Sequence, residues 1–296
     1  MRARPTRFRP RFLLLPCLLA AICVSTGCSF AFRYAYNHAD WLVYRKLDPF
    51  LDLNDAQRAV FDARFAELWQ WHRRSELPRY ADTLHALADR IETLNAPVTP
   101  ATLDARAEPF TEFARRIKTR ALPHAVDVLS SLSDAQVDGL IAQVEEKDEE
   151  FKDEFLAGDA EDRADHYADW TEDKLDDWLG HVTDPQQALV RQWAAGRRDH
   201  PDRVMQARAA RRAALRSLLD DRRDADFARR LAAFIEDPSR YRSTTRQADA
   251  AFNRQHFLQM LARVINLADA EQRAHAADRL RDYADDFAQL ARESDA

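Results

Sequence analysis

The chain has 296 residues, of which 44 are basic, 50 are acidic and 46% are hydrophobic. Its first 27 residues carry five of the 44 basic residues and no acids, so the remainder has 39 bases against 50 acids and a net charge of −11. Such an acidic chain is a poor candidate for binding nucleic acid or for coating an anionic bilayer through charge alone. Its five glycines cannot assemble a G-x-G-x-x-G, Walker or G-x-S-x-G loop, which excludes ordinary dinucleotide, P-loop NTPase and α/β-hydrolase sites.

The chain begins with the layout of a bacterial secretory signal. Five arginines lead into an apolar run over residues 12–24, which is too short for an ordinary membrane-spanning helix. A Ser-Thr-Gly-Cys sequence then closes the run at Cys28 and resembles a lipobox, although Ser25 stands where an aliphatic residue is usual. We therefore expect residues 1–27 to be a lipoprotein signal peptide that is cleaved between Gly27 and Cys28, with a diacylglyceryl anchor on Cys28.

Residues 28–50 form an aromatic-rich segment directly behind the predicted anchor. This segment could rest at the bilayer interface, where the amphipathic rings of Tyr and Trp are favoured. We favour the alternative that one helical face, made of Tyr34, His38, Trp41 and Tyr44, packs on the domain, because charged residues would share any membrane-facing position.

From residue 51 onward, apolar residues recur at helical spacing, and two-residue alternation is nowhere sustained. The pattern predicts an all-α fold, either a multi-helix bundle or an elongated helical array of amphipathic helices. Because the candidate boundaries are short, we expect residues 51–296 to form a single all-helical domain. Pro78, Pro109 and Pro123 interrupt helical patterns and are expected to end or kink a helix.

Four helix starts share one pattern: an apolar residue, an N-cap oxygen, an acid in the first turn and a glutamine. Their caps and glutamines are Asn54 with Gln57, Ser133 with Gln136, Thr183 with Gln186 and, more loosely, Asp269 with Gln272. In such a start the cap side chain accepts from an unpaired backbone N–H, and the glutamine reaches back. The pattern indicates either an internal repeat or convergent capping. We favour capping, because the copies are unevenly spaced.

Three segments carry a resemblance to a known family. They read Tyr36-Asn37-His38-Ala39-Asp40-Trp41-Leu42, Leu51-Asp52-Leu53-Asn54-Asp55-Ala56-Gln57-Arg58 and Trp69-Gln70-Trp71-His72-Arg73-Arg74-Ser75-Glu76-Leu77-Pro78-Arg79-Tyr80. Over residues 28–80 the chain resembles a family of Gram-negative lipoproteins catalogued as domain of unknown function 6279, with Asn54 where Thr or Ser is usual. The resemblance implies a lipoprotein that faces the periplasm, and it supplies no activity.

The third segment contains our candidate interaction patch. Its residues are Trp69, His72, Arg73, Glu76, Arg79 and Tyr80. On a helix, His72 and Glu76 lie four apart and could form an acid–base pair or part of a metal site, but zinc needs three or four ligands and nothing nearby supplies the rest. The favoured interpretation places the aromatic and histidine side chains on a packed face with ion pairs around them. We therefore expect no catalytic residue, no cofactor and no metal.

Charge is segregated along the chain. Residues 145–177 hold 16 acids against 4 bases, whereas residues 186–230 hold 12 arginines against 6 aspartates. The arginines at issue are Arg203, Arg208, Arg211, Arg212 and Arg216. They could form a face for an anionic partner, but we favour the interpretation that acidic and basic helices pack together and satisfy one another.

The leading functional hypothesis is a lipid-anchored envelope lipoprotein that is not an enzyme and acts by binding, as a scaffold or accessory protein with a protein partner in the envelope. A periplasmic chaperone or foldase is the alternative, because similar glutamine helix starts occur in small helical chaperones. An envelope hydrolase built on His72 and Glu76 is the least favoured. Since Ser29 rather than Asp follows Cys28, we expect the periplasmic side of the outer membrane, with the inner membrane left open.

Overall fold

The computed structural model describes residues 29–94 and 96–293, and all regular secondary structure within them is helical. The elements are α2 (Ser29–Asn37), α3 (Ala39–Leu51), α4 (Asp55–Trp71), the π-helical turn η1 (His72–Glu76), α5 (Leu77–Glu92), α6 (Pro100–Ser130), α7 (Asp134–Phe155), α8 (Ala160–Leu179), α9 (Asp184–Ala195), α10 (Pro201–Asp220), α11 (Phe227–Glu236), the 3₁₀ turn η2 (Pro238–Tyr241), α12 (Thr244–Leu267) and α13 (Ala270–Arg292). The all-α prediction is confirmed. The predicted cleavage site at Gly27 and Cys28 lies outside the described residues.

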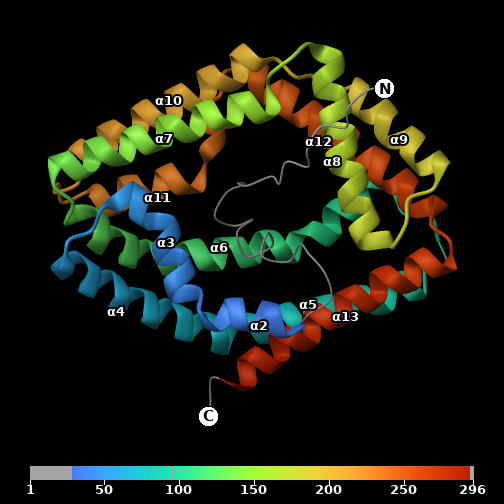
Figure 1. Ribbon diagram of the computed structural model, residues 1–296, viewed down its shortest axis with the longest axis horizontal. Helices are drawn as coiled ribbons and strands as arrows, with labels where there is room; N and C mark the ends of the chain where they lie inside the picture. Colours follow the sequence, from blue (N-terminus) through green and yellow to red (C-terminus); the bar gives the residue numbers. More distant parts are fainter. Residues whose placement is uncertain (1–28, 95, 294–296) are drawn as a thin grey trace, which may run out of the picture.

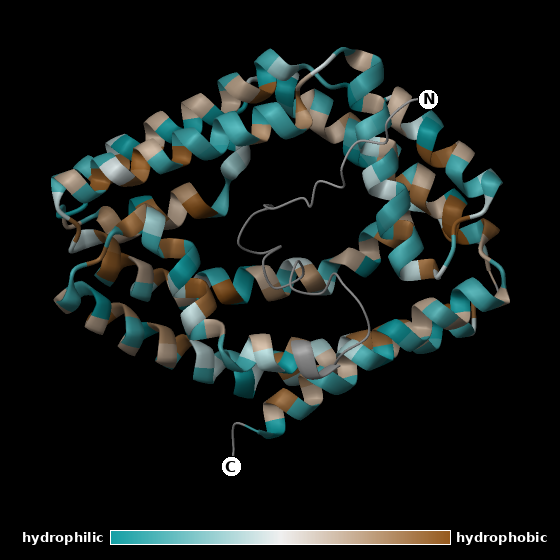
Figure 2. Cartoon of the chain, in the orientation of Figure 1, coloured by the Kyte–Doolittle hydropathy of each residue, from teal (hydrophilic) through white to brown (hydrophobic). Residues whose placement is uncertain are grey.

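The helices are arranged as a flattened ring (Figure 1). Along one long edge α7 packs on α10, and along the opposite edge α5 packs on α13. Helices α3, α4 and α11 close one end, α8, α9 and α12 close the other, and α6 runs between the two ends. Figure 2 shows hydrophilic and hydrophobic residues alternating along these helices, as amphipathic rods require. Among the described helices, none has the length and apolarity to cross a bilayer.

The apolar core is divided between the two ends of the ring. At the first end, buried side chains of α3, α4, α6, α7, α10 and α11 form one cluster around Leu132 and Leu219. At the other end, α8, α9, α12 and α13 form a second cluster around Val190 and Val264. Smaller clusters join α5 to α13 and α2 to both of them. The ring therefore consists of two packed ends that are bridged by long helices.

A reciprocal pair of glutamines locks the first end. Gln57 and Gln136 each accept from the N–H of their own cap residue, and each donates across to the other. Gln57 also donates to the Ser131 carbonyl at 2.8 Å, and Gln136 donates to the Asp52 carbonyl at 2.7 Å. The two helix starts, α4 and α7, thus satisfy the backbone groups that precede each other.

The second end carries a matching pair. Gln186 and Gln272, both 0% exposed, donate to each other's side-chain oxygens at 3.1 and 2.9 Å. Gln186 also donates to the Val264 carbonyl, and Gln272 donates to the His181 carbonyl at 2.8 Å. All four predicted helix starts are confirmed, and their glutamines also join helices that are distant in sequence.

The order of helices and contacts repeats between the two halves of the chain. Helices α4 and α5 lead through α6 to α7, and α9 and α10 lead through α11 and α12 to α13. The last helix of each half packs on the other half, α7 on α10 and α13 on α5. Paired glutamines are 79 residues apart in the first half and 86 in the second. The pairing supports an internal repeat, against which the uneven spacing of successive copies had argued.

Replacing either Gln186 or Gln272 with alanine should lower the free energy of unfolding by about 1–3 kcal/mol, because a backbone carbonyl loses its hydrogen-bond donor. Since Gln186→Ala and Gln272→Ala break the same network, the double variant should cost clearly less than their sum. Denaturant unfolding measures all three. Gln70→Ala, at an exposed position of α4, serves as the control and should stay within about 0.5 kcal/mol of wild type. Strictly additive losses would contradict the pairing.

Candidate functional site

The N-terminal helix α2 is docked onto the ring by its aromatic side chains. Tyr36 is 3% exposed and stacks on Trp69 of α4 with ring centroids 4.4 Å apart. Phe32, one turn earlier, packs edge-on against Phe287 of α13 at 5.6 Å. Tyr80 of α5 also meets Phe287, so that α2, α4, α5 and α13 share one aromatic cluster. These contacts attach the segment behind the predicted lipid site to the body of the protein.

His72 lies at the centre of this cluster and bonds a tyrosine on each side. Its Nδ1 is 2.7 Å from the Tyr36 hydroxyl, and its Nε2 is 3.2 Å from the Tyr80 hydroxyl. Burial, aided by the charge of Arg73, lowers the pKa of His72 to about 4, and burial raises the pKa of both tyrosines. All three side chains are therefore neutral at pH 7. A neutral imidazole has one N–H, so one tyrosine donates to the ring and the other accepts from it.

The π-helical turn η1 positions His72 and Glu76. The turn lies directly before α5, which contains Pro78. Proline disturbs an α-helix because it has no N–H and its ring crowds the carbonyl four residues earlier. The Leu77 N–H instead bonds the His72 carbonyl, five residues back, and the chain continues as α5. Pro78 is thus accommodated by a wider turn without ending the helix, and α6 continues through Pro109 and Pro123.

An ion pair between the buried Glu76 and the partly exposed Arg116 lies beneath this turn. Glu76 is 0% exposed, and both of its oxygens accept from Arg116 of α6. The Arg116 Nε is 3.0 and 3.1 Å from the two oxygens, and its Nη2 is 2.6 Å from Oε1. This two-pronged geometry compensates the buried carboxylate and ties α6 to the turn between α4 and α5.

Most of the candidate interaction patch packs against other parts of the same chain. His72 and Glu76 are buried, and Trp69, Arg73 and Tyr80 are partly buried against other parts of this chain. Arg73 donates to the Asn37 side chain and lies over the Tyr36 ring, while Arg79 is exposed. We call the set Tyr36, Trp69, His72, Glu76, Tyr80 and Arg116 the His72 joint.

The expectation that one aromatic face of residues 28–50 packs on the domain is corrected. Tyr34 is 57% exposed and Trp41 is 54% exposed, whereas Tyr36 and Ala39 are buried. Of the four residues expected on the packed face, Tyr44 alone is partly buried in a core cluster. The packed side of the segment is offset from the predicted one because aromatic residues occupy both sides.

The basic helix α10 is paired within the protein, as we favoured. Arg208 and Arg212 both donate to Asp148, a 5% exposed aspartate of the acidic helix α7. Arg216 bonds Asp138 of α7. Arg203 bonds Asp249, and Arg211 lies over the Phe234 ring. Since α7 and α10 form one long edge of the ring, these pairs set the register of that edge.

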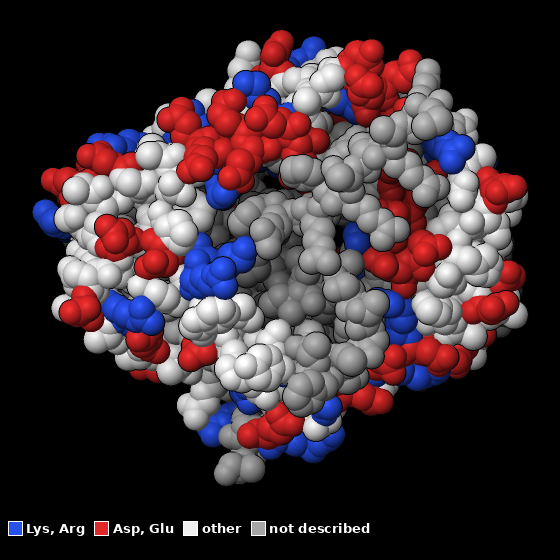
Figure 3. All heavy atoms as spheres, viewed as in Figure 1, with Lys and Arg blue, Asp and Glu red and all other residues white. Residues whose placement is uncertain are grey.

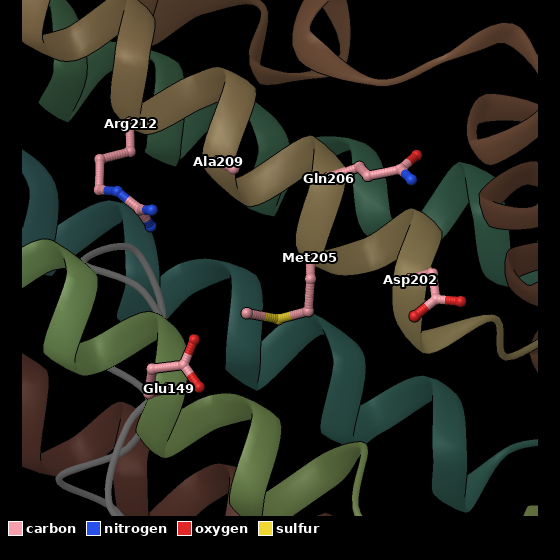
Figure 4. Close-up of a pocket in the computed structure, with 6 residues that line it drawn as sticks. All are labelled: Glu149, Asp202, Met205, Gln206, Ala209 and Arg212. Carbon is pink, nitrogen blue, oxygen red and sulfur yellow. The ribbon is translucent and has the colours of Figure 1, made fainter.

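Two shallow grooves lie between paired helices. Figure 4 shows the groove between α7 and α10, of about 410 Å³, with Met205 reaching from α10 toward α7 and Glu149 on the facing helix. The other, of about 280 Å³, lies between α5 and α6 and includes Leu87, Phe110 and Arg106. Both linings mix apolar and charged side chains. Within the described part of the chain, no group of three or more His, Cys, Asp or Glu residues is arranged to hold a metal ion.

Sequence reasoning missed Tyr36 and Arg116 as members of the joint. Tyr36 lies in the first of the three segments that carry the family resemblance, and His72 lies in the third. Their shared resemblance was a signal that the two segments belong together. Arg116 is 40 residues from Glu76 in an ordinary helical stretch, and nothing in its surroundings marks it.

The model of a family described as "Family of unknown function (DUF6279)" matches residues 49–245. No curated protein and no solved structure matches the chain.

The buried histidine predicts how stability changes with pH. Folding lowers the pKa of His72 from 6.5 to about 4. Between pH 4 and pH 6.5, His72 is therefore protonated in the unfolded chain and neutral in the folded one. Stability is therefore complete above pH 6.5 and falls as the pH drops toward 4, by on the order of 3 kcal/mol from this residue. In His72→Gln this loss should disappear, as denaturant unfolding across that interval would show.

The control is His200→Gln, at an exposed histidine before α10, which should keep the wild-type pH dependence. An unchanged pH dependence in His72→Gln would show that the histidine does not exclude its proton in the folded state.

Proposed function

The chain belongs to the family of unknown function DUF6279, and we propose that it is a lipid-anchored protein on the periplasmic side of the cell envelope. It acts there by binding a protein partner, as a scaffold or accessory protein, and not as an enzyme. The proposed anchor is a diacylglyceryl group on Cys28. The proposed address is the outer membrane, because Ser29 stands where an aspartate would favour retention at the inner membrane.

The observation that carries the binding role is the bonding of His72 and Glu76 within the chain. These are the two residues that an envelope hydrolase would need as its acid–base pair. Both ring nitrogens of His72 are bonded to tyrosines of the same chain, and both oxygens of Glu76 are bonded to Arg116. A general acid or base needs an atom within reach of a substrate. These side chains instead hold α2 against α4, α5 and α6, which supports a role in positioning the protein behind its anchor.

The glutamine helix starts support a scaffold over a chaperone. Gln57, Gln136, Gln186 and Gln272 bond backbone carbonyls of neighbouring helix ends, so their role is to close the ring. The grooves along α7–α10 and α5–α6 offer apolar side chains next to paired charges, a mixture typical of protein–protein contacts.

Metabolic labelling with palmitate tests the anchor. Wild-type protein should incorporate label and fractionate with the outer membrane, and Cys28→Ala should incorporate none, because the acyl group has no attachment site. Cys23→Ala is a matched control within the predicted signal peptide, and it should leave labelling of the mature protein unchanged. A mature wild-type protein with a free thiol at Cys28 would contradict the proposal.

The binding half of the proposal has a separate measurement. Tagged wild-type protein, cross-linked in intact cells, should recover the same envelope protein in repeated experiments. Turnover of an envelope substrate by the purified protein, lost in His72→Ala, would contradict the non-enzymatic assignment and favour the hydrolase.

A further inference from the structure

Helices α2 and α3 carry a row of exposed side chains on either side of the turn that joins them. Its members are Tyr34, His38, Trp41 and Arg45, which follow one another at helical spacing and are all exposed. Tyr34 stacks on His38 with centroids 4.0 Å apart, and the guanidinium of Arg45 lies 5.3 Å from the Trp41 ring. We call these four residues the N-terminal stripe.

The stripe differs from the other exposed apolar side chains of the described chain. Tyr34 and Trp41 are the two most exposed large hydrophobic residues, at 57% and 54%, and they lie seven residues apart. The others lie singly on different helices: Val60 on α4, Phe110 on α6, Trp178 on α8 and Leu267 on α12. Two rings with polar edges, one on α2 and one on α3 beside the turn at His38, together with a histidine and an arginine, match the composition of membrane-interface segments.

The start of the stripe lies next to the proposed lipid site. Helix α2 begins at Ser29, the residue that directly follows Cys28, so their Cα atoms are about 3.8 Å apart along the chain. With nine residues, α2 is about 14 Å long, and Tyr34 therefore lies within one and a half turns of the bilayer surface.

Charge on this part of the chain fits a phospholipid surface. Residues 29–48 contain Arg33, Arg45 and Lys46 against Asp40 and Asp48, a net charge of +1 in a chain whose part after residue 27 has a net charge of −11. Figure 3 shows this side of the molecule, with basic side chains over α3 and uncharged ones over the α2–α3 junction. Arg33 is paired with Asp286 of α13, and Arg45 and Lys46 balance Asp40 and Asp48, so anionic headgroups repel this segment less than the acidic remainder of the ring.

We propose that the N-terminal stripe, with Tyr34 on α2 and Trp41 on α3 on either side of the turn at His38, lies on the phospholipid bilayer with both rings at the level of the headgroups. The inference rests on the proposed anchor at Cys28, which brings α2 to the membrane. Because the His72 joint holds α2 against the ring, contact along the stripe sets the orientation of the whole ring relative to the bilayer. The protein then lies against the membrane in one pose, whereas a lipid tether alone would leave its orientation free.

A single fluorescent label tests the position of the stripe. The sulfur of Cys28 would be occupied by lipid, and the other two cysteines precede it, so an introduced cysteine is the only free thiol of the mature protein. His38→Cys places an environment-sensitive nitrobenzoxadiazole label between the two rings and leaves both in place. Leu267→Cys is the matched control, because Leu267 is 51% exposed and precedes α13, roughly 25 Å along that helix from Phe287.

Both lipidated forms are reconstituted into vesicles of phosphatidylethanolamine and phosphatidylglycerol. The label at position 38 should show blue-shifted emission and quenching by brominated lipids, and the label at 267 should show neither. Adding Tyr34→Ala and Trp41→Ala to His38→Cys should remove the shift while the protein still co-sediments with vesicles.

The outcomes separate the inference from the proposed function. The protein could co-sediment with vesicles while the label at position 38 emits as it does in water, or while the labels at 38 and 267 show equal blue shifts. Either result would overturn the inference without contradicting the lipid anchor on Cys28. A protein partner on the stripe would give a blue shift in native envelopes without quenching by brominated lipids, which would also overturn it. Failure of wild-type protein to co-sediment would overturn the anchor and the inference together.

Discussion

The carboxylate of Glu76, fully buried beneath a π-helical turn, is the constraint on which the rest of the N-terminal half depends. A buried charge is tolerated when a partner of opposite charge and sufficient hydrogen bonds compensate its lost hydration. Arg116 supplies both, and α6 must therefore lie across the junction of α4 and α5. The same turn presents His72 to the tyrosines on either side, so that α2 is tied to the ring through Tyr36.

The ring itself is closed by a device that occurs twice. At each end, two helix starts exchange glutamine hydrogen bonds and satisfy the backbone that precedes the other helix, as for Gln57 with Gln136 and Gln186 with Gln272. Each half then extends its last helix onto the other half, α7 on α10 and α13 on α5. Both long edges carry ion pairs, around Asp148 between α7 and α10 and around Arg281 between α5 and α13, and the second edge also packs small apolar residues such as Ala88 and Ala277.

Local rules predicted the parts of this structure that depend on neighbouring residues. The four helix starts were predicted because a cap and its glutamine lie three residues apart, and the cap side chain accepts a backbone N–H at Asn54, Ser133 and Asp269. The hydrogen bonds between paired glutamines were not predicted, because they join residues that are 79 and 86 positions apart in the sequence. Pro78 predicted an end or a kink in the helix. The structure instead has a π turn before this proline, and His72 and Glu76 are buried in that turn. Periodicity could not assign the packed side of α2 and α3, because Tyr34 and Tyr36 give both sides an aromatic residue. Arg116 carries no local signal for Glu76.

The central claim, that the Glu76–Arg116 pair holds the N-terminal helix α2 to the ring, is tested most directly by hydrogen exchange of α2 in two neighbouring arginine variants. Arg116→Met leaves Glu76 buried without its cation, which should cost about 3–5 kcal/mol and speed exchange of the α2 amides far more than those of α9 and α12. Arg115→Met removes an arginine that is 66% exposed and bonded to exposed Glu112, and it should leave exchange close to wild type. Equal protection of α2 in both variants would contradict the claim.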